Sequence, residues 1–480
     1  MAAAAQTATG IWIDGKFHDA LDGARFAVED PSTGLTLTDC ACAGTEDATR
    51  ALDSACRAQS TWAAAAPRER SEVLRAAWEL LTANAVEFAH LITAEMGKPV
   101  NESLSEVSYG AEFLRWYSEE AVRINGRVTR SPSGTGRILV DKVPVGPCLA
   151  ITPWNFPLAM ATRKIGPALA AGCTIVLKPS EETPLTALAL AQVFDNAGLP
   201  AGVLSVLPTT DSAAVAGQLM NDRRLRKVSF TGSTSVGREL IARAAPNVLR
   251  MSMELGGNAP FIVLHDADID AAVNGAMIAK MRNGGQACTA ANRFLVAAPI
   301  REAFTSRLSE RMAALTVGSG YLDNVDLGPL ISRKHHDKVA RLVDEAIMDG
   351  ARLRTGGKPI QRPGYFYEAT VLDNVPADAR VLDEEIFGPI AVITEFETRE
   401  QAIELANRTD YGLAAYVYTK DLAQAHKVSD ALQFGMIGIN RAMVSDPAAP
   451  FGGIKHSGLG TEGGAEGLAE YLESKYIATT

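Results

Sequence analysis

The chain has 480 residues, 47% of them hydrophobic and 21% charged, which is the composition of a globular protein with a large core. Its net charge of −10 argues against nucleic-acid binding, because nucleic-acid-binding proteins usually present a basic surface. Its six cysteines are sparse and irregularly spaced, and the opening MAAAAQTATG lacks the basic and apolar regions of a signal peptide. We therefore expect a cytoplasmic protein with no disulfide scaffold, bound metal, membrane contact or nucleic-acid partner.

The predicted elements change character along the chain. Residues 46–120 carry apolar side chains at three- and four-residue spacing, which is typical of amphipathic helices. Residues 127–146 have a Ser/Gly turn between two β-prone arms and predict a hairpin. The C-terminal LAEYLESKYIATT ends in a β-capable segment, which we expect to pair with this hairpin or with another subunit.

From about residue 147 the chain alternates between strands and helices. A helix follows each of the strands CLAITPW, CTIVLKP, GVLSVLP and KVSFTGS, and this order predicts a parallel sheet covered by helices on both faces. Two further strand–helix pairs begin near residue 251, which is enough for a second α/β domain. Residues 458–463, GLGTEG, match a dinucleotide-binding fingerprint but lie outside any βαβ unit, so we interpret them as a turn.

Polar residues follow the apolar strands of the first run, and ligands bind at such strand ends in parallel α/β sheets. A helix opening at Gly232 and Ser233 would favour an anion such as pyrophosphate, because its first N–H groups are free. Each turn alone is more often a helix cap, but three on one sheet favour a dinucleotide site. The residues are Trp154, Asn155, Lys178, Ser180, Glu181, Gly232 and Ser233.

Three residues suggest carbonyl chemistry. Cys288 follows a Gly-Gly turn in NGGQACTAANR, and its thiolate could attack a carbonyl carbon. Glu254 in MELGGNAP is an acid among apolar residues, where a raised pKa would suit a general base. The Asn155 amide could donate to the resulting oxyanion. Spacing alone leaves open whether the three converge.

The segments FTGSTSVG, MELGGNAP, NGGQACTAANR, EEIFGP and PFGGIKHSGLG, in this order, resemble the NAD(P)-dependent aldehyde dehydrogenase superfamily over essentially the whole chain. The resemblance implies an α/β fold with two doubly wound parallel-sheet domains and a small β oligomerisation element, hence a homodimer or homotetramer. It assigns residues 1–121 and 144–253 to a cofactor-binding domain and residues 254–456 to a catalytic domain. Residues 122–143 and 457–480 would form the oligomerisation element.

The resemblance also implies a role for individual residues. Cys288 would form a thiohemiacetal with the aldehyde, Asn155 and the Cys288 N–H would form the oxyanion hole, and Glu254 would activate water against the thioester. Glu385 and Phe387 in EEIFGP resemble contacts to the nicotinamide ribose and ring. The other cofactor-binding residues would be Trp154, Lys178, Ser180, Glu181, Gly232 and Ser233.

The substrate prediction depends on two arginines. Arg163 follows TPWNFP, Arg282 lies six residues before Cys288, and with Ser445 they resemble the substrate-carboxylate contacts of succinate-semialdehyde dehydrogenases. Since Arg holds carboxylates in a bidentate fork, they predict an aldehyde with a distal carboxylate, with succinate semialdehyde first. The alternative is that both arginines form surface or interface ion pairs.

For the cofactor, Glu181 would accept hydrogen bonds from a free 2′-hydroxyl and repel a 2′-phosphate, so we predict NAD in preference to NADP. Lys178 leaves NADP possible.

The chain departs from the succinate-semialdehyde subfamily in places. Ala290 stands where many members have a second cysteine, so no redox-switch disulfide is expected there. The TTDS turn lacks a frequent glycine, and Thr461 stands where Arg is common. These differences leave open an aromatic or glutarate-type aldehyde. A CoA-acylating enzyme generally lacks the acid at Glu254, and an inactive binding protein would lose the catalytic groups that this chain retains.

Overall fold

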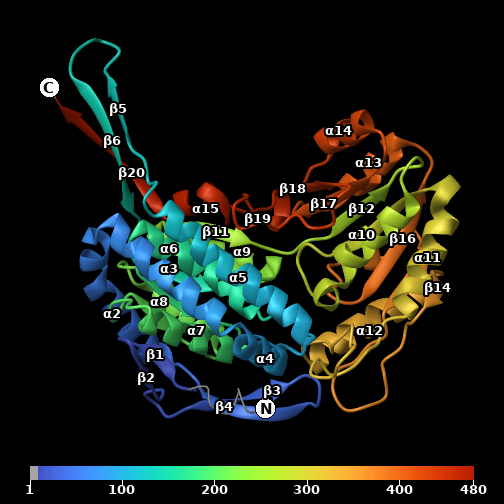
Figure 1. Cartoon of the computed structure of the whole chain (residues 1–480), viewed down its shortest axis with the longest axis horizontal. Helices are drawn as coiled ribbons and strands as arrows, with labels where there is room; N and C mark the ends of the chain where they lie inside the picture. Colours follow the sequence, from blue (N-terminus) through green and yellow to red (C-terminus); the bar gives the residue numbers. More distant parts are fainter. Residues whose placement is uncertain (1–8, 480) are drawn as a thin grey trace.

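The computed structural model describes residues 9–479 and has two α/β halves, with a long β hairpin projecting from one of them (Figure 1). The chain begins with two antiparallel strand pairs that the sequence pattern did not indicate. The helical segment that follows is as predicted. These elements are β1 (Ile11–Ile13), β2 (Lys16–His18), β3 (Arg25–Asp30), β4 (Leu35–Ala41), α2 (Thr45–Ala64), α3 (Pro67–Ala83), α4 (Ala85–Met96) and α5 (Val100–Glu120).

The first sheet has the strand order β19-β11-β10-β7-β8-β9-β1-β2, and its strands from β11 to β9 are parallel, as predicted. Both edges are antiparallel, because β1 pairs with β9 and β19 with β11. The elements of this run are β7 (Cys148–Ile151), α6 (Pro157–Ala171), β8 (Ile175–Lys178), α7 (Pro184–Asn196), β9 (Leu204–Val206), α8 (Ser212–Asn221), β10 (Lys227–Thr231), α9 (Thr234–Ala244), β11 (Arg250–Glu254) and β19 (Gly458–Leu459).

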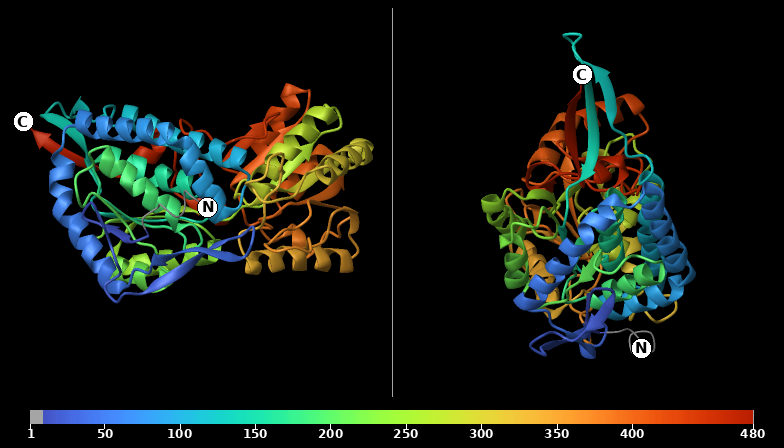
Figure 2. Two further views of the ribbon diagram at one scale, coloured as in Figure 1. Left: turned by 60° about the horizontal axis from the view of Figure 1, so that its bottom comes forward. Right: turned by 90° about the vertical axis from the view of Figure 1, so that its left-hand side faces the viewer.

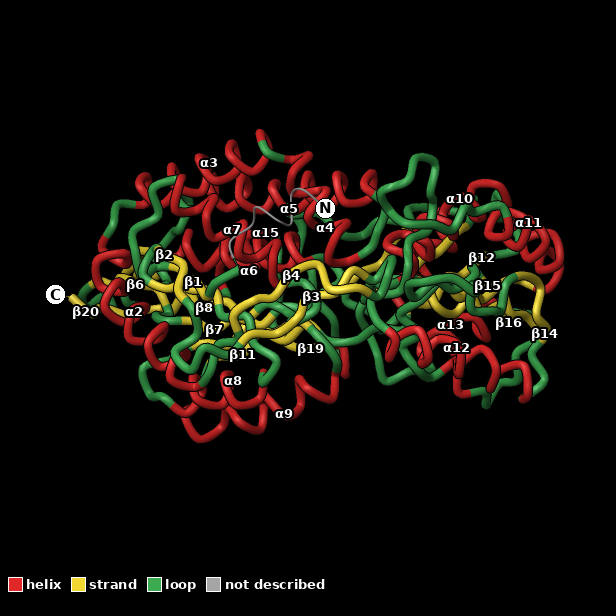
Figure 3. Tube along the Cα trace, turned by 90° about the horizontal axis from the view of Figure 1, so that it is seen from below, coloured by secondary structure: helices red, strands yellow, loops and turns green. Residues whose placement is uncertain are grey.

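The second sheet has the order β14-β15-β16-β13-β12-β17-β18 and is parallel except at β14, which confirms a second α/β domain. In both halves, helices lie on the two sides of the strands (Figure 3). The elements are β12 (Ala259–Val263), α10 (Ile269–Met281), β13 (Ala291–Ala297), α11 (Arg301–Ala313), α12 (Arg333–Met348), β14 (Arg352–Thr355), β15 (Thr370–Asp373), β16 (Ile390–Phe396), α13 (Arg399–Asn407), β17 (Ala414–Tyr418), α14 (Leu422–Ala431) and β18 (Met436–Ile439).

A third sheet joins the predicted hairpin to the C-terminus. β5 (Arg127–Arg130) and β6 (Arg137–Pro144) form the hairpin, and β20 (Leu472–Thr479) pairs antiparallel with β6, which confirms the expected pairing of the tail. This sheet extends away from the body of the molecule (Figure 2). The GLGTEG segment is the short edge strand β19 followed by a turn, and α15 (Gly464–Ala469) comes after it.

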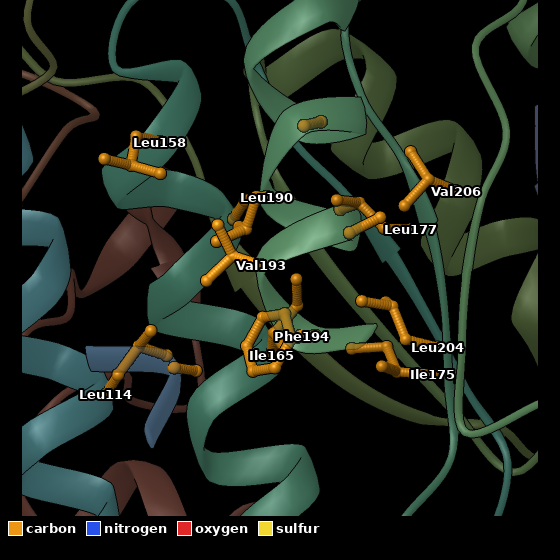
Figure 4. Packing of buried hydrophobic residues seen from close by; sticks show 14 of the residues in the cluster. Leu114, Leu158, Ile165, Ile175, Leu177, Leu190, Val193, Phe194, Leu204 and Val206 are labelled. Atoms are coloured by element: carbon orange, nitrogen blue, oxygen red, sulfur yellow. The ribbon is translucent and has the colours of Figure 1, made fainter. Parts of the chain in front are cut away.

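The main core of the first half lies between its sheet and the helices α3, α5, α6 and α7. Leu114 of α5, Ile165 of α6 and Phe194 of α7 pack in this layer, together with Ile175 and Leu204 of the strands (Figure 4). Every residue of α6 is buried, including Arg163 and Lys164. A buried cation is costly unless it is paired, so these two side chains require partners inside the protein.

No helix within residues 9–479 is long and apolar enough to cross a membrane. The six cysteines are free thiols: three are buried and three, including Cys288, are partly exposed.

Candidate active site

A cavity of about 240 Å³ lies where the two halves of the protein meet. Its walls combine the loop after β7, the loop after β10, the segment before β13 and the segment before β16. Most of the predicted site residues therefore share one cavity. They are Trp154, Asn155, Arg163, Gly232, Ser233, Arg282, Cys288, Glu385, Phe387 and Ser445.

The nucleophile candidate Cys288 follows a left-handed turn in which Asn283, Gly284 and Gly285 have φ values of 55°, 60° and 74°. A Cβ atom at Gly285 would lie 2.2 Å from the carbonyl oxygen of Gly388, so this position requires glycine. Burial raises the pKa of the Cys288 thiol to about 12, although the Arg163 guanidinium opposes the shift. An ordinary cysteine is already a thiol at neutral pH, and this raised pKa makes the thiolate still harder to form, so attack requires a base or a further cation.

Asn155 lies on the loop between β7 and α6 and is buried. Its Nδ2 donates to the carbonyl oxygen of Gln286 at 3.1 Å. A primary amide carries two N–H groups, so one remains to donate to an oxygen in the cavity.

Glu254 is the last residue of β11, and its side chain is almost completely buried. Its Oε2 has no hydrogen-bond partner among the described residues. Burial raises its pKa well above the ordinary range, and the nearby carboxylate of Glu462 adds to the shift. The direction of this shift is the one expected from the sequence, although Glu254 is not among the residues that line the catalytic cavity.

Both arginines face the same cavity. The Arg163 side chain is 2% exposed, and its Nη2 donates to the Tyr109 hydroxyl at 2.5 Å and to Ser445 Oγ at 3.5 Å. Tyr109 and Ser445 are hydrogen-bonded to each other. The guanidinium carbon of Arg282 lies 4.8 Å from the centre of the Phe156 ring and 5.6 Å from that of Tyr109. This end of the cavity is therefore cationic and rich in hydroxyl groups.

The cofactor candidates at the other end of the cavity come from both halves. Ser233 caps α9 by accepting from the N–H of Val236 at 3.4 Å, and Glu385 Oε1 accepts from the N–H of Gly257 at 2.9 Å. Burial raises the pKa of Glu385 to about 7. The Trp154 and Phe387 rings meet edge to face, with centroids 5.3 Å apart.

Lys178, Ser180 and Glu181 lie at the carboxyl end of β8, outside the catalytic cavity. Lys178 Nζ is 3.4 Å from Glu181 Oε2, and Glu181 lines a second cavity of about 370 Å³. A third cavity of about 920 Å³ shares Ser233 and Glu385 with the catalytic one. Space beside the N-terminus of α9, flanked by carboxylates that could accept hydrogen bonds from ribose hydroxyl groups, fits a dinucleotide.

A model of the aldehyde dehydrogenase family matches residues 17–477. The chain belongs to this family. It is 55% identical to the succinate-semialdehyde dehydrogenase of Paenarthrobacter nicotinovorans, over 92% of this chain and 98% of the relative. It is 45% identical to the glutarate-semialdehyde dehydrogenase of Pseudomonas putida, over 97% and 96% of the two chains. The crystal structure of an NADP-dependent enzyme from E. coli has a TM-score of 0.97 and 44% identity, over 98% of both chains.

The aldehyde dehydrogenase fold also brings in residues that the sequence pattern did not indicate. Glu462 forms a buried ion pair with Lys164 and lies 3.6 Å from Arg163 Nη1, so its single carboxylate offsets one of the two positive charges of α6. Although burial by itself raises the pKa of Glu462, the two cations hold it below the ordinary value. Tyr109, whose hydroxyl accepts from Arg163, is the second site residue that the sequence pattern did not indicate. The sequence contained one indirect signal for Glu462. Two adjacent cations in an apolar helix require an acidic partner, but the sequence does not say which acid it is.

Proposed function

We propose that this aldehyde dehydrogenase oxidises succinate semialdehyde to succinate, with Cys288 as nucleophile. The observation that carries the proposal is the cationic end of the catalytic cavity, where Arg163, Arg282, Tyr109 and Ser445 line the same space as Cys288. A carboxylate there would receive charge-assisted hydrogen bonds from the guanidinium groups. The relative that is 55% identical and named a succinate-semialdehyde dehydrogenase supports the same substrate.

In the proposed reaction, the Cys288 thiol gives its proton to water in the cavity, and the resulting thiolate, which the Arg163 charge favours, attacks the aldehyde carbon. The free N–H of Asn155 donates to the oxygen as it becomes negative. A bound NAD(P) would supply the acceptor for the hydride of the thiohemiacetal and would be held by Ser233, Glu385 and Phe387. Glu254 then takes a proton from a water molecule, whose oxygen attacks the thioester carbon. The Cys288 sulfur leaves and takes up the proton, so that the carboxylic acid is released and the thiol is restored.

We propose NAD as the preferred form of the NAD(P) cofactor that the family uses. Support comes from Glu181, whose carboxylate lies beside Lys178 and would repel a 2′-phosphate. The E. coli relative is named an NADP-dependent enzyme, and Lys178 is the group here that would tolerate the phosphate.

We also propose the domain division predicted from the sequence. Outside the hairpin, the strands from β1 to β11 belong to the first sheet or to the separate β3–β4 pair. The strands from β12 to β18 form the second sheet, and β19 returns to the first. β5 is the outer strand of the third sheet, and Val128 on β5 and Tyr476 on β20 are 61% and 63% exposed. These features support assembly into a homodimer or homotetramer, in a cytoplasmic setting that suits six free thiols.

The test is NADH formation by the purified protein. Succinate semialdehyde, glutarate semialdehyde, butyraldehyde and benzaldehyde are compared by kcat/KM, with Cys288→Ala as the inactive control. A preference for succinate semialdehyde supports the proposal. Higher values with glutarate semialdehyde would favour the longer substrate, and equal values with the uncharged aldehydes would refute a carboxylate site.

A further inference from the structure

Glu102 and Glu106 lie four residues apart near the start of α5, and Lys98 lies two residues before this helix begins. Residues at this spacing project from the same side of a helix. None of the three lines the catalytic cavity. Lys98 and Glu106 are 3% and 2% exposed, and they form a buried ion pair of 2.6 Å between Nζ and Oε2.

The Lys98–Glu106 pair holds the backbone at Asn155 and shortly after it. Lys98 Nζ donates to the carbonyl oxygen of Asn155 at 2.8 Å. Glu106 Oε1 accepts from the N–H groups of Leu158 and Ala159, at 2.9 and 3.2 Å, in the first turn of α6. The loop that carries the oxyanion donor is thus held by the Lys98–Glu106 pair at Asn155 and at the start of α6.

Glu102 connects the same helix to the turn that carries Cys288. Its carboxylate accepts from the N–H of Asn283 at 2.9 and 3.1 Å. Asn283 Nδ2 in turn donates to the carbonyl oxygens of Asn155 and Gln286, both at 2.9 Å. Because Asn155 Nδ2 also donates to Gln286, the oxyanion donor and the nucleophile's turn belong to one hydrogen-bond network.

We propose that Lys98, held by Glu106, is a positioning residue for the oxyanion hole. By fixing the Asn155 carbonyl, Lys98 keeps one N–H of the Asn155 amide on Gln286 and the other directed at the carbonyl oxygen of the aldehyde. A buried ion pair is weak evidence for a role in stability, because desolvation offsets much of the attraction. The additional hydrogen bond from Lys98 to the Asn155 carbonyl oxygen instead connects this pair to the oxyanion hole and gives it a role in catalysis.

This inference rests on the roles proposed for Cys288 and Asn155, but not on the substrate. It is therefore tested with butyraldehyde, which has no carboxylate. Lys98→Met is expected to lower kcat about 100-fold, the size of losing an oxyanion donor, and to leave KM within about threefold. Lys427→Met, which replaces an exposed lysine on α14, is the matched control and should change nothing.

A double-mutant cycle separates positioning from general damage. If Lys98 acts through the Asn155 amide, Lys98→Met should lower kcat less than about twofold in an Asn155→Ala background, because the interaction is already absent. Equal losses in both backgrounds, or no loss in either, would overturn the inference. A fully active Asn155→Ala enzyme would instead refute the proposed oxyanion hole.

Glu106→Gln provides a second variant, since its amide oxygen can still accept from the N–H groups of α6 while the charge is removed. It should lower kcat in the same direction as Lys98→Met and show the same dependence on Asn155. Thermal unfolding of each variant accompanies the kinetics. Failure of both variants to fold would assign the pair to folding and also overturn the positioning role.

Discussion

Replacing Arg163 by methionine tests the substrate pocket most directly. Methionine keeps an unbranched apolar side chain beside the Phe451 ring, whose centre is 4.1 Å from the guanidinium carbon. Hydrogen bonds to charged groups contribute about 1.5–3 kcal/mol each, so losing one or two of them from a buried carboxylate costs roughly 1.5–6 kcal/mol. That loss corresponds to about a 10- to 10⁴-fold fall in kcat/KM for succinate semialdehyde.

Arg163 also lowers the pKa of Cys288, so its removal should slow every aldehyde to some extent. The informative quantity is therefore the ratio of kcat/KM for succinate semialdehyde to that for butyraldehyde. We expect this ratio to collapse in Arg163→Met and to stay constant in Arg311→Met, an exposed arginine of α11. A ratio unchanged by Arg163→Met would refute the reasoning and leave Arg163 as the partner of Glu462.

Further predictions address the base, the cofactor, the hydroxyl network and the core. Glu254→Gln should abolish thioester hydrolysis, which steady-state rates and stopped-flow NADH formation will show. The variant should also lose the part of the wild-type pH profile in which the rate rises with pH, because the raised pKa of Glu254 means that its carboxylate forms only as pH increases. Glu181→Ser should raise the NADP-to-NAD ratio of kcat/KM, and an unchanged ratio would exclude Glu181 as the selector. Tyr109→Phe removes the hydroxyl that accepts from Arg163 and should raise KM for succinate semialdehyde severalfold without affecting butyraldehyde. Phe194→Ala empties a fully buried core position and should cost about 3–5 kcal/mol in urea unfolding, with kcat per folded molecule unchanged.

Much of the fold could be predicted because it depends on local patterns. Apolar runs and helical spacing between residues 147 and 244 correspond to the alternating elements from β7 to α9. The antiparallel edges β1 and β19 could not be predicted in this way. β19 pairs with β11 across roughly 200 residues of chain, and nothing in either segment identifies the partner.

The same distinction between local pattern and tertiary structure applies to the candidate site. The sequence by itself determined the residue types that the chemistry requires. They are a cysteine after a Gly-Gly turn, an acid in an apolar strand, an amide at a strand end, and one arginine near the cysteine and another near the amide. Their ionisation states were decided only by the tertiary structure. Burial raises the pKa of the Cys288 thiol, which makes the thiolate harder to form, and it raises the pKa of Glu254. Glu462, which lies 298 positions along the chain from Lys164, offsets one of the two buried positive charges of α6. Desolvation and charge pairing depend on distances in space, so they arise only when the chain has folded.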